Sequence, residues 1–156
     1  MNIKLVRATF DDCQELYTLQ IKAFKPLLDK YQDFSTNPGA EPFERTVQRF
    51  NESITQFWFI SLDGKNIGAL RICDFGDLCK LKQIYILPEH QGNGYAQKTI
   101  RLIENMYPNA VRWELDTILQ EDRLCYLYEK MGYRKTGKIK NIKDGMDNVF
   151  YAKDCK

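Results

Sequence analysis

The sequence predicts one mixed α/β (α+β) domain, with a central sheet of six to seven strands flanked by about four helices. Strand-like and helix-like stretches follow the order strand, two helices, three strands, helix, strand, helix, two strands. Residues 78–115 form a strand–helix–strand unit, which places a parallel strand pair in the middle of the sheet. Because the chain has 156 residues without a repeat or linker, we expect a single domain over residues 1–156.

The N-terminal third predicts a strand and two helices. Residues 3–8 alternate as a strand does, and Thr9 is a hydroxyl cap with an acid, Asp12, three residues later, which is typical of a helix start. Apolar residues at helical spacing continue this helix, and Pro26 is expected to end or kink it. An irregular connection then leads to a second helix that begins near Pro42.

The middle of the chain predicts a hairpin and the first strand of the parallel pair. Residues 56–62 and 67–73 read as strands, and the Asp-Gly dipeptide at 63–64 between them is a strong hairpin-turn signal. Residues 78–87 give the next strand, which Pro88 stops. A helix with apolar residues on one face follows, and it ends before Pro108.

The last third predicts a strand, a helix and a closing hairpin. Apolar and polar residues alternate over 110–118, and residues 122–131 have the spacing of an amphipathic helix that Gly132 terminates. Residues 133–140 and 148–153 are the final strands, on either side of the Asp-Gly turn at 144–145.

Composition excludes several classes of function. With 23 basic and 21 acidic residues the chain lacks the basic stripe of nucleic-acid binders, and no apolar run reaches the roughly 18 residues of a membrane span. Five scattered cysteines without a C-x-x-C pair, and a lone His90, predict neither a disulfide framework nor a zinc site. The N-terminus shows no apolar signal segment. We therefore expect a cytoplasmic protein with no nucleic-acid, membrane or metal partner, and with a homodimer as one option for its assembly.

The turn at residues 91–96, Gln-Gly-Asn-Gly-Tyr-Ala, carries the strongest chemical signal. The first N–H groups of the helix that follows have no partner within it and lie at the positive end of its dipole, which suits a diphosphate. Gly92 and Gly94 let phosphate oxygens approach the backbone. The spacing is not G-x-G-x-x-G, because residue 97 is Gln, and the P-loop lysine is absent. Taken alone, the turn is equally consistent with a glycine-rich connection that binds nothing.

Two motifs resemble those of the GNAT superfamily of acetyl-CoA-dependent N-acetyltransferases. Residues 91–96 resemble its Q/R-x-x-G-x-G/A signature, and residues 83–89, Gln-Ile-Tyr-Ile-Leu-Pro-Glu, resemble the strand before that signature. Residues 127–133, Leu-Tyr-Glu-Lys-Met-Gly-Tyr, resemble the tyrosine helix that forms its second hallmark. The resemblance covers residues 78–136 and implies a splayed parallel strand pair that binds the cofactor.

The resemblance also implies a site, with acetyl-CoA as donor substrate and no metal. Backbone N–H groups would hold the pyrophosphate, strand residues would pair with the pantetheine arm, and a lysine would neutralise the ribose phosphate. In that order, the expected cofactor-binding residues are Gln91, Gly92, Asn93, Gly94, Tyr95 and Ala96; Ile84, Ile86 and Leu87; and Lys130, with Lys98 and Arg101 as weaker candidates. For each of these three cations a solvated surface charge is the plainer explanation. The N–H of Ile86 would polarise the thioester carbonyl.

Tyr128 matches the family's general acid, placed to contact the cofactor's sulfur and protonate it. A phenol near pKa 10 protonating a thiol near 8.5 is uphill by roughly 2 kcal/mol, which a positioned donor can overcome. By helical pattern alone Tyr128 would simply pack in the core. The resemblance favours direct attack by a primary amine in a ternary complex.

The sequence departs from the family pattern at two places. Glu121 stands where many members have a cofactor-contacting asparagine, seven residues before the tyrosine, and we expect it to point to solvent. The glutamate that some members use as base is replaced at residues 82–83 by Lys and Gln. Three sources of proton removal stay open: Glu114 through water, Asp116 through water, or an amine that arrives deprotonated. Both departures favour an alternative function, a non-catalytic acyl-CoA-binding sensor or scaffold; a nucleotide-binding fold is a third.

Residues 24–45 and 140–148 are expected to shape the acceptor site, as in the family. Acidic side chains there could attract a cationic amine and aromatic ones could line the cleft, although a solvated acidic loop explains the acids equally well. The acids are Asp29, Asp33, Glu41 and Glu44, and the aromatics are Tyr31, Phe34 and Phe43. A small-molecule amine, such as a polyamine, an aminoglycoside or an amino acid, and a protein amino group all fit.

Overall fold

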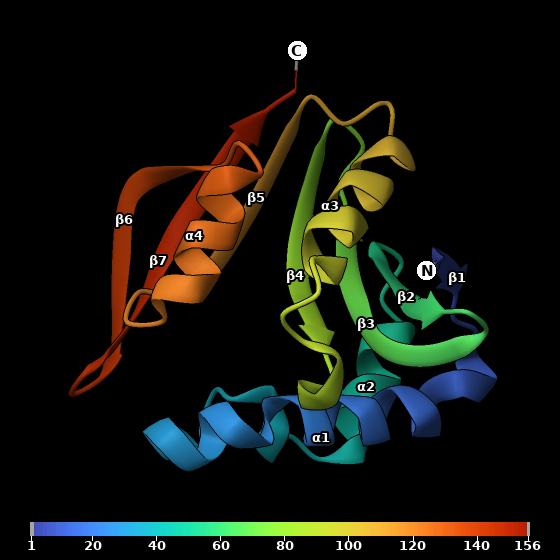
Figure 1. The fold of residues 1–156 in the computed structure, drawn as a ribbon, viewed down its shortest axis with the longest axis horizontal. Helices are drawn as coiled ribbons and strands as arrows, with labels where there is room; N and C mark the ends of the chain where they lie inside the picture. Colours follow the sequence, from blue (N-terminus) through green and yellow to red (C-terminus); the bar gives the residue numbers. More distant parts are fainter. Residues whose placement is uncertain (1, 156) are drawn as a thin grey trace.

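The computed structural model describes residues 2–155 as a seven-stranded sheet flanked by helices on both faces (Figure 1). The strand order is β1-β2-β3-β4-β5-β7-β6. The strands are β1 (Ile3–Arg7), β2 (Thr55–Leu62), β3 (Lys65–Asp74), β4 (Leu78–Ile86), β5 (Arg112–Ile118), β6 (Arg134–Lys143) and β7 (Met146–Asp154). The helices are α1 (Cys13–Tyr31), α2 (Phe43–Phe50), α3 (Tyr95–Asn105) and α4 (Asp122–Lys130).

The predicted mixed sheet and the predicted parallel pair are confirmed. β4 and β5 run parallel and every other neighbouring pair is antiparallel. The Asp63-Gly64 turn between β2 and β3 has positive φ at both residues, 49° and 88°, as a type I′ hairpin requires. Within residues 2–155, every helix is too short or too polar for a transmembrane span.

Two hydrophobic clusters lie on opposite faces of the sheet. On one face, Leu16 and Leu19 of α1 pack against Phe57 and Tyr85. On the other face, Ile100 of α3 and residues of α4 join a larger cluster with the centre of the sheet. The sheet is therefore the middle of three layers, with α1 and α2 on one side and α3 and α4 on the other.

Pro26 was expected to end or kink the first helix; it does not end it, because α1 continues to Tyr31. Proline removes one backbone hydrogen bond and frees the carbonyl four residues earlier, that of Lys22. Pro26 and Lys22 are both on the exposed side of the helix, where water can satisfy that carbonyl. Gln32, with φ 54°, then ends the helix in a left-handed conformation.

The sheet splits between β4 and β5. The two strands pair only where they begin, from Leu78 opposite Arg112 to Lys80 opposite Glu114. The register between β3 and β4 shifts at this point: Arg71 lies opposite Gln83 and the next residue lies opposite Leu81, so β4 has one extra residue. The bulge bends β4 away from β5, and the strands diverge toward α1, which crosses beneath the opening (Figure 1).

Candidate active site

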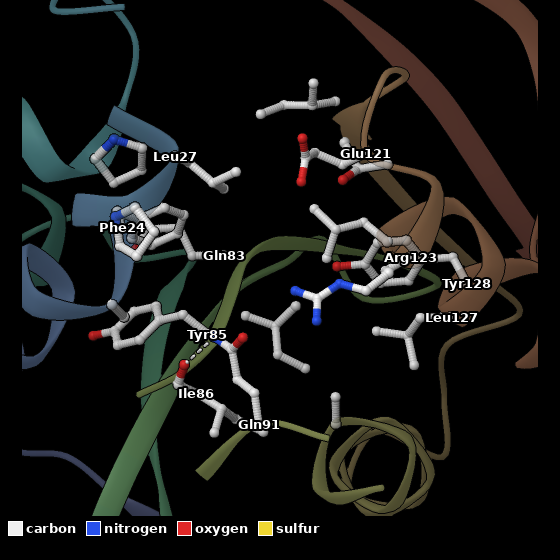
Figure 2. A pocket seen from close by; sticks show the side chains of 18 of the residues that line it. Phe24, Leu27, Gln83, Tyr85, Ile86, Gln91, Glu121, Arg123, Leu127 and Tyr128 are labelled. Carbon is white, nitrogen blue, oxygen red and sulfur yellow. Dashed lines mark hydrogen bonds between the residues drawn. The ribbon is translucent and has the colours of Figure 1, made fainter. Parts of the chain in front are cut away.

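A cleft of about 970 Å³ fills the opening between β4 and β5. Figure 2 shows Phe24 and Leu27 of α1 and Gln83, Tyr85 and Ile86 of β4 on one side, with Arg123, Leu127 and Tyr128 of α4 on the other. Its lining also includes Asp116 of β5. The cleft therefore reaches from the α3–α4 side of the sheet through the split to the α1 side.

The turn from β4 to α3 forms one end of the cleft. Gly92 and Gly94 have φ of 81° and 77°, in the left-handed region that glycine adopts readily, as the sequence predicts. A Cβ added at either glycine would meet nothing within 4 Å, so the space in front of the backbone is open. No side chain caps α3, so the N–H groups of its first turn face this space without a capping group. The residues present therefore fit a diphosphate.

The side chains of this turn hold its shape. Gln91 Nε2 donates to the carbonyl of Ile86 (2.9 Å; Figure 2), and Asn93 Nδ2 donates to the carbonyls of His90 (3.2 Å) and Gln91 (3.3 Å). Tyr95 and Ala96 of α3 line the cleft with Gln91 and both glycines, whereas Asn93 does not. These side-chain hydrogen bonds fix the conformation of the loop, and the loop presents its backbone to the cleft.

The edge of β4 beside the split presents backbone at alternate residues. Leu87 was expected to pair with the cofactor, but its N–H donates to the Ile67 carbonyl (2.8 Å) and its carbonyl accepts from His90 N–H (2.9 Å). Since backbone groups alternate along a strand, those of Ile84 and Ile86 face away from β3 and toward the split. Ile84 and Ile86 line the cleft, and they remain as the two β4 residues able to pair with an extended ligand.

Tyr128 is the buried phenol of the cleft. It is 6% exposed and its ring packs edge-on to that of Tyr133, with centroids 6.2 Å apart. Its hydroxyl makes no hydrogen bond to any other residue in 2–155, and its side chain points from α4 toward the split (Figure 2). Burial, and to a lesser extent the charge of Asp116, raise the pKa of Tyr128 above its ordinary range, so the hydroxyl keeps its proton at neutral pH.

The cations of this site differ from those expected. Lys130 lies on the exposed last turn of α4, with Nζ 5.9 Å from the Tyr126 ring centroid, and does not line the cleft; nor do Lys98 and Arg101 of α3. Arg123 lines it instead, and its guanidinium points into the cleft (Figure 2). Arg123 forms no salt bridge with another residue in the described chain. Sequence reasoning missed it because no motif marks this position.

The expectation that Glu121 points to solvent is wrong. Its side chain is 14% exposed, and its Oε2 accepts hydrogen bonds from Lys30 Nζ and from the hydroxyl of Tyr31, each at 2.6 Å. Burial raises its pKa, but these two hydrogen bonds, together with the positive charges of Lys30 and Arg123, bring the pKa of Glu121 below the ordinary value. The uninterrupted α1 causes this contact, because its last turn carries Lys30 and Tyr31 to the start of α4.

The structure separates the two carboxylates that sequence left as alternatives. Glu114 binds Arg112 (2.9 Å), approaches Lys80 (3.9 Å) and does not line the cleft. Asp116 does line it, accepts a hydrogen bond from Asn148 Nδ2 (3.0 Å), and is close enough to Tyr128 to raise its pKa. Asp116 is therefore the carboxylate beside the phenol.

Few of the expected acceptor-site residues reach the cleft. Of the four acids, Asp33 lines it, whereas Asp29 pairs with Lys25 at the surface, Glu41 binds Arg49 through two 2.7 Å hydrogen bonds, and Glu44 is exposed. Of the three aromatics, Tyr31 reaches Glu121, Phe34 is 64% exposed and Phe43 packs against Tyr17. Asp29 and Glu41 thus stay outside the cleft, paired with cations only four and eight residues away in sequence.

Comparison with known proteins gives both a family and a fold. The family model "Acetyltransferase (GNAT) domain" matches residues 53–135, more than half of the chain. No match is found among curated proteins.

Solved structures similar to this chain include three acetyltransferases. An acetyltransferase from Thermus thermophilus is 14% identical, with TM-score 0.76, over 99% of this chain and 97% of that one. A chimera of Vibrio cholerae SpeG spermidine N-acetyltransferase and hSSAT is 19% identical, with TM-score 0.75, over 99% and 96%. PaiA N-acetyltransferase from Thermoplasma acidophilum, solved with coenzyme A, is 14% identical, with TM-score 0.73, over 99% of both chains. At these identities the likeness is one of fold.

Proposed function

The chain belongs to the GNAT family of acetyltransferases, and from this premise we propose that it transfers an acetyl group from acetyl-CoA to a primary amine by direct attack in a ternary complex. The observation that carries the proposal is the split between β4 and β5. Along one continuous cleft lie the open backbone of residues 91–96 (the cradle), two strand residues, Ile84 and Ile86, whose N–H groups face the split, and a buried phenol. An acyl-CoA has the matching order of parts: diphosphate, extended arm and thioester.

Each part of the cleft has a role in donor binding. The backbone of residues 91–96 holds the pyrophosphate at the start of α3. Ile84 and Ile86 hydrogen-bond the pantetheine arm as a neighbouring strand would, and the Ile86 N–H polarises the thioester carbonyl. Arg123 lines the cleft between Gln91 on the donor side and Glu121 on the acceptor side, and adds a positive charge there (Figure 2).

The proton steps belong to Tyr128 and Asp116. As the amine nitrogen bonds to the acetyl carbon and the carbon–sulfur bond breaks, Tyr128 donates its proton to the departing sulfur. Its raised pKa makes it a weaker acid, but a thiolate that forms in the same buried place is also a stronger base than in water. Asp116 takes the proton lost by the amine, directly or through water, and later releases it to solvent, while the phenolate left on Tyr128 regains a proton from solvent.

A screen for thiol release tests the proposal. Acetyl-CoA is incubated with the protein and a panel of primary amines and peptides, and free thiol is followed with time. We expect thiol release that depends on the amine, together with a product heavier by one acetyl group in mass spectrometry. Thiol release at the same rate with and without every amine would contradict acetyl transfer.

Two features of the site weigh against the alternative of a non-catalytic sensor. The charge of Glu121 is paired with Lys30, at the opposite end of the cleft from Gln91 (Figure 2). The missing strand glutamate is matched by Asp116 on the opposite strand. A sensor would bind CoA, which a rise in the protein's melting temperature on adding CoA would detect, yet release no thiol with any acceptor in the panel.

A further inference from the structure

The carboxylate of Glu121 is held on one oxygen and open on the other. Lys30 and Tyr31 both donate to Oε2. Oε1 has no hydrogen-bond partner among residues 2–155, although a carboxylate can accept up to about four. Because Glu121 lines the cleft at its acceptor side, this capacity faces the space an acceptor would occupy.

The two donors differ in how firmly they are placed. The Tyr31 hydroxyl is on a stiff side chain and is part-buried in its contact with Glu121. Lys30 reaches the same oxygen with a flexible chain that is 58% exposed, so water can take over the solvation of its ammonium group when it leaves. Tyr31 therefore holds the carboxylate in position, while Lys30 can leave at little cost.

Lys30 presents to Glu121 a primary ammonium, the same chemical group that a cationic acceptor would present. We infer that Glu121 anchors a second, non-reacting ammonium group of the acceptor, and that Lys30 fills this place in the free protein. This inference rests on the proposed acetyl transfer and names the substrate class of that site: straight-chain diamines and related amines with a positive charge at each end.

The geometry sets the reach of such an acceptor. Glu121 directly precedes α4 and Tyr128 follows seven residues later, which is about 10 Å along the helix axis. One nitrogen can therefore react beside Tyr128 while the other lies at Glu121. The cleft lining carries four carboxylates against three Lys and Arg cations, so the departure of Lys30 leaves an excess of two negative charges, which matches a dication.

The test compares straight-chain diamines of increasing length with monoamines of the same length, by steady-state kinetics with acetyl-CoA. Glu121→Gln should raise KM for the preferred diamine by about tenfold or more, since a hydrogen bond between charged groups is lost, and leave KM for the monoamine unchanged. Lys30→Met should lower KM for the diamine severalfold, because the internal competitor is gone. If the Lys30–Glu121 pair only holds α1 against α4, both variants should instead change KM in the same direction.

Lys25→Met is the matched control, because Lys25 pairs with Asp29 on the exposed side of the same helix, at 3.1 Å, outside the cleft. It should leave both KM values unchanged. Equal effects of Glu121→Gln on diamine and monoamine, or a diamine KM raised by Lys30→Met, would overturn the inference while the transfer activity stands. Thermal unfolding of each variant separates misfolding from lost binding. Absence of thiol release with every amine would overturn the acetyl-transfer proposal, and this inference with it.

Discussion

The donor side and the acceptor side of the cleft are built in different ways. The donor side, from Ile84 to Ala96, consists of backbone groups from one continuous segment, shaped by a bulge, two glycines and a helix start. The acceptor side consists of side chains from segments far apart: Lys30 and Glu121 are 91 residues apart in sequence, and Asp116 and Asn148 are 32 apart. The first kind of site depends on local conformation, and the second on long-range contacts.

The difference predicts how mutations act. On the donor side a side chain matters mainly where its Cβ would enter the cradle, so most substitutions there should have little effect on CoA binding. On the acceptor side each charged side chain has one specific partner, and a single substitution can change which amine is accepted. Four predictions test this contrast, ordered by the size of the expected effect.

The largest effect is expected where the two sides meet. Tyr128→Phe should lower kcat by roughly a hundredfold, at the low end of general acid catalysis, and leave the Kd of CoA within about twofold, because the ring still packs. Rates of thiol release and calorimetric titration with CoA measure the two quantities. Tyr151→Phe is the control: it removes another core hydroxyl, one bound to Glu129 and outside the cleft, and should leave kcat unchanged. An unaltered kcat in Tyr128→Phe would remove the general-acid assignment.

A smaller effect is expected from filling the cradle. Gly94→Ala should weaken CoA binding by about tenfold, or about 1.4 kcal/mol, because the new Cβ occupies the ligand's space. Left-handed backbone also costs alanine about 1–2 kcal/mol, so stability falls as well. Gly76→Ala separates the two causes: Gly76 has φ of 92° and an equally open Cβ position, but lies in the turn between β3 and β4, outside the cleft. Equal CoA affinity in the two variants would place the diphosphate elsewhere.

Asp116 and Glu114 offer a paired test on the acceptor side. Asp116→Asn should lower kcat/KM for the amine severalfold near neutral pH, since the amide cannot take a proton, whereas Glu114→Gln should not. The difference should shrink as pH rises and more of the amine arrives already deprotonated. If the two variants behave alike, the proton leaves by a route that neither carboxylate serves.

The smallest effect concerns pH. Burial and Asp116 raise the pKa of Tyr128, so its protonated, donating form persists to a higher pH than that of an exposed tyrosine. The kcat should therefore not fall as pH rises through about 10, the ordinary phenol value, provided that the protein stays folded. Thermal unfolding at each pH supplies that control. A loss of kcat with a midpoint below about 10 would mean that Tyr128 is not the titrating acid.

The same contrast explains what could be predicted from sequence. The hairpins, the parallel pair and the turn at 91–96 follow from periodicity, turn residues and a local motif, and all are present in the structure. The path of α1 through Pro26 was missed because it depends on which side of the helix faces water. That error hid the contact of Lys30 and Tyr31 with Glu121, and no local pattern distinguishes Asp116 from Glu114 or marks Arg123 as a cleft residue. The contacts on the acceptor side could therefore be identified only from the three-dimensional structure.

The most direct test of the proposed donor site is a crystal structure with CoA bound, because it shows where the donor lies. We expect the pyrophosphate against the backbone of residues 91–96, the pantetheine arm alongside Ile84 and Ile86 in the split, and the sulfur within hydrogen-bond reach of the Tyr128 hydroxyl. CoA bound outside the split between β4 and β5, or with its sulfur remote from Tyr128, would contradict it.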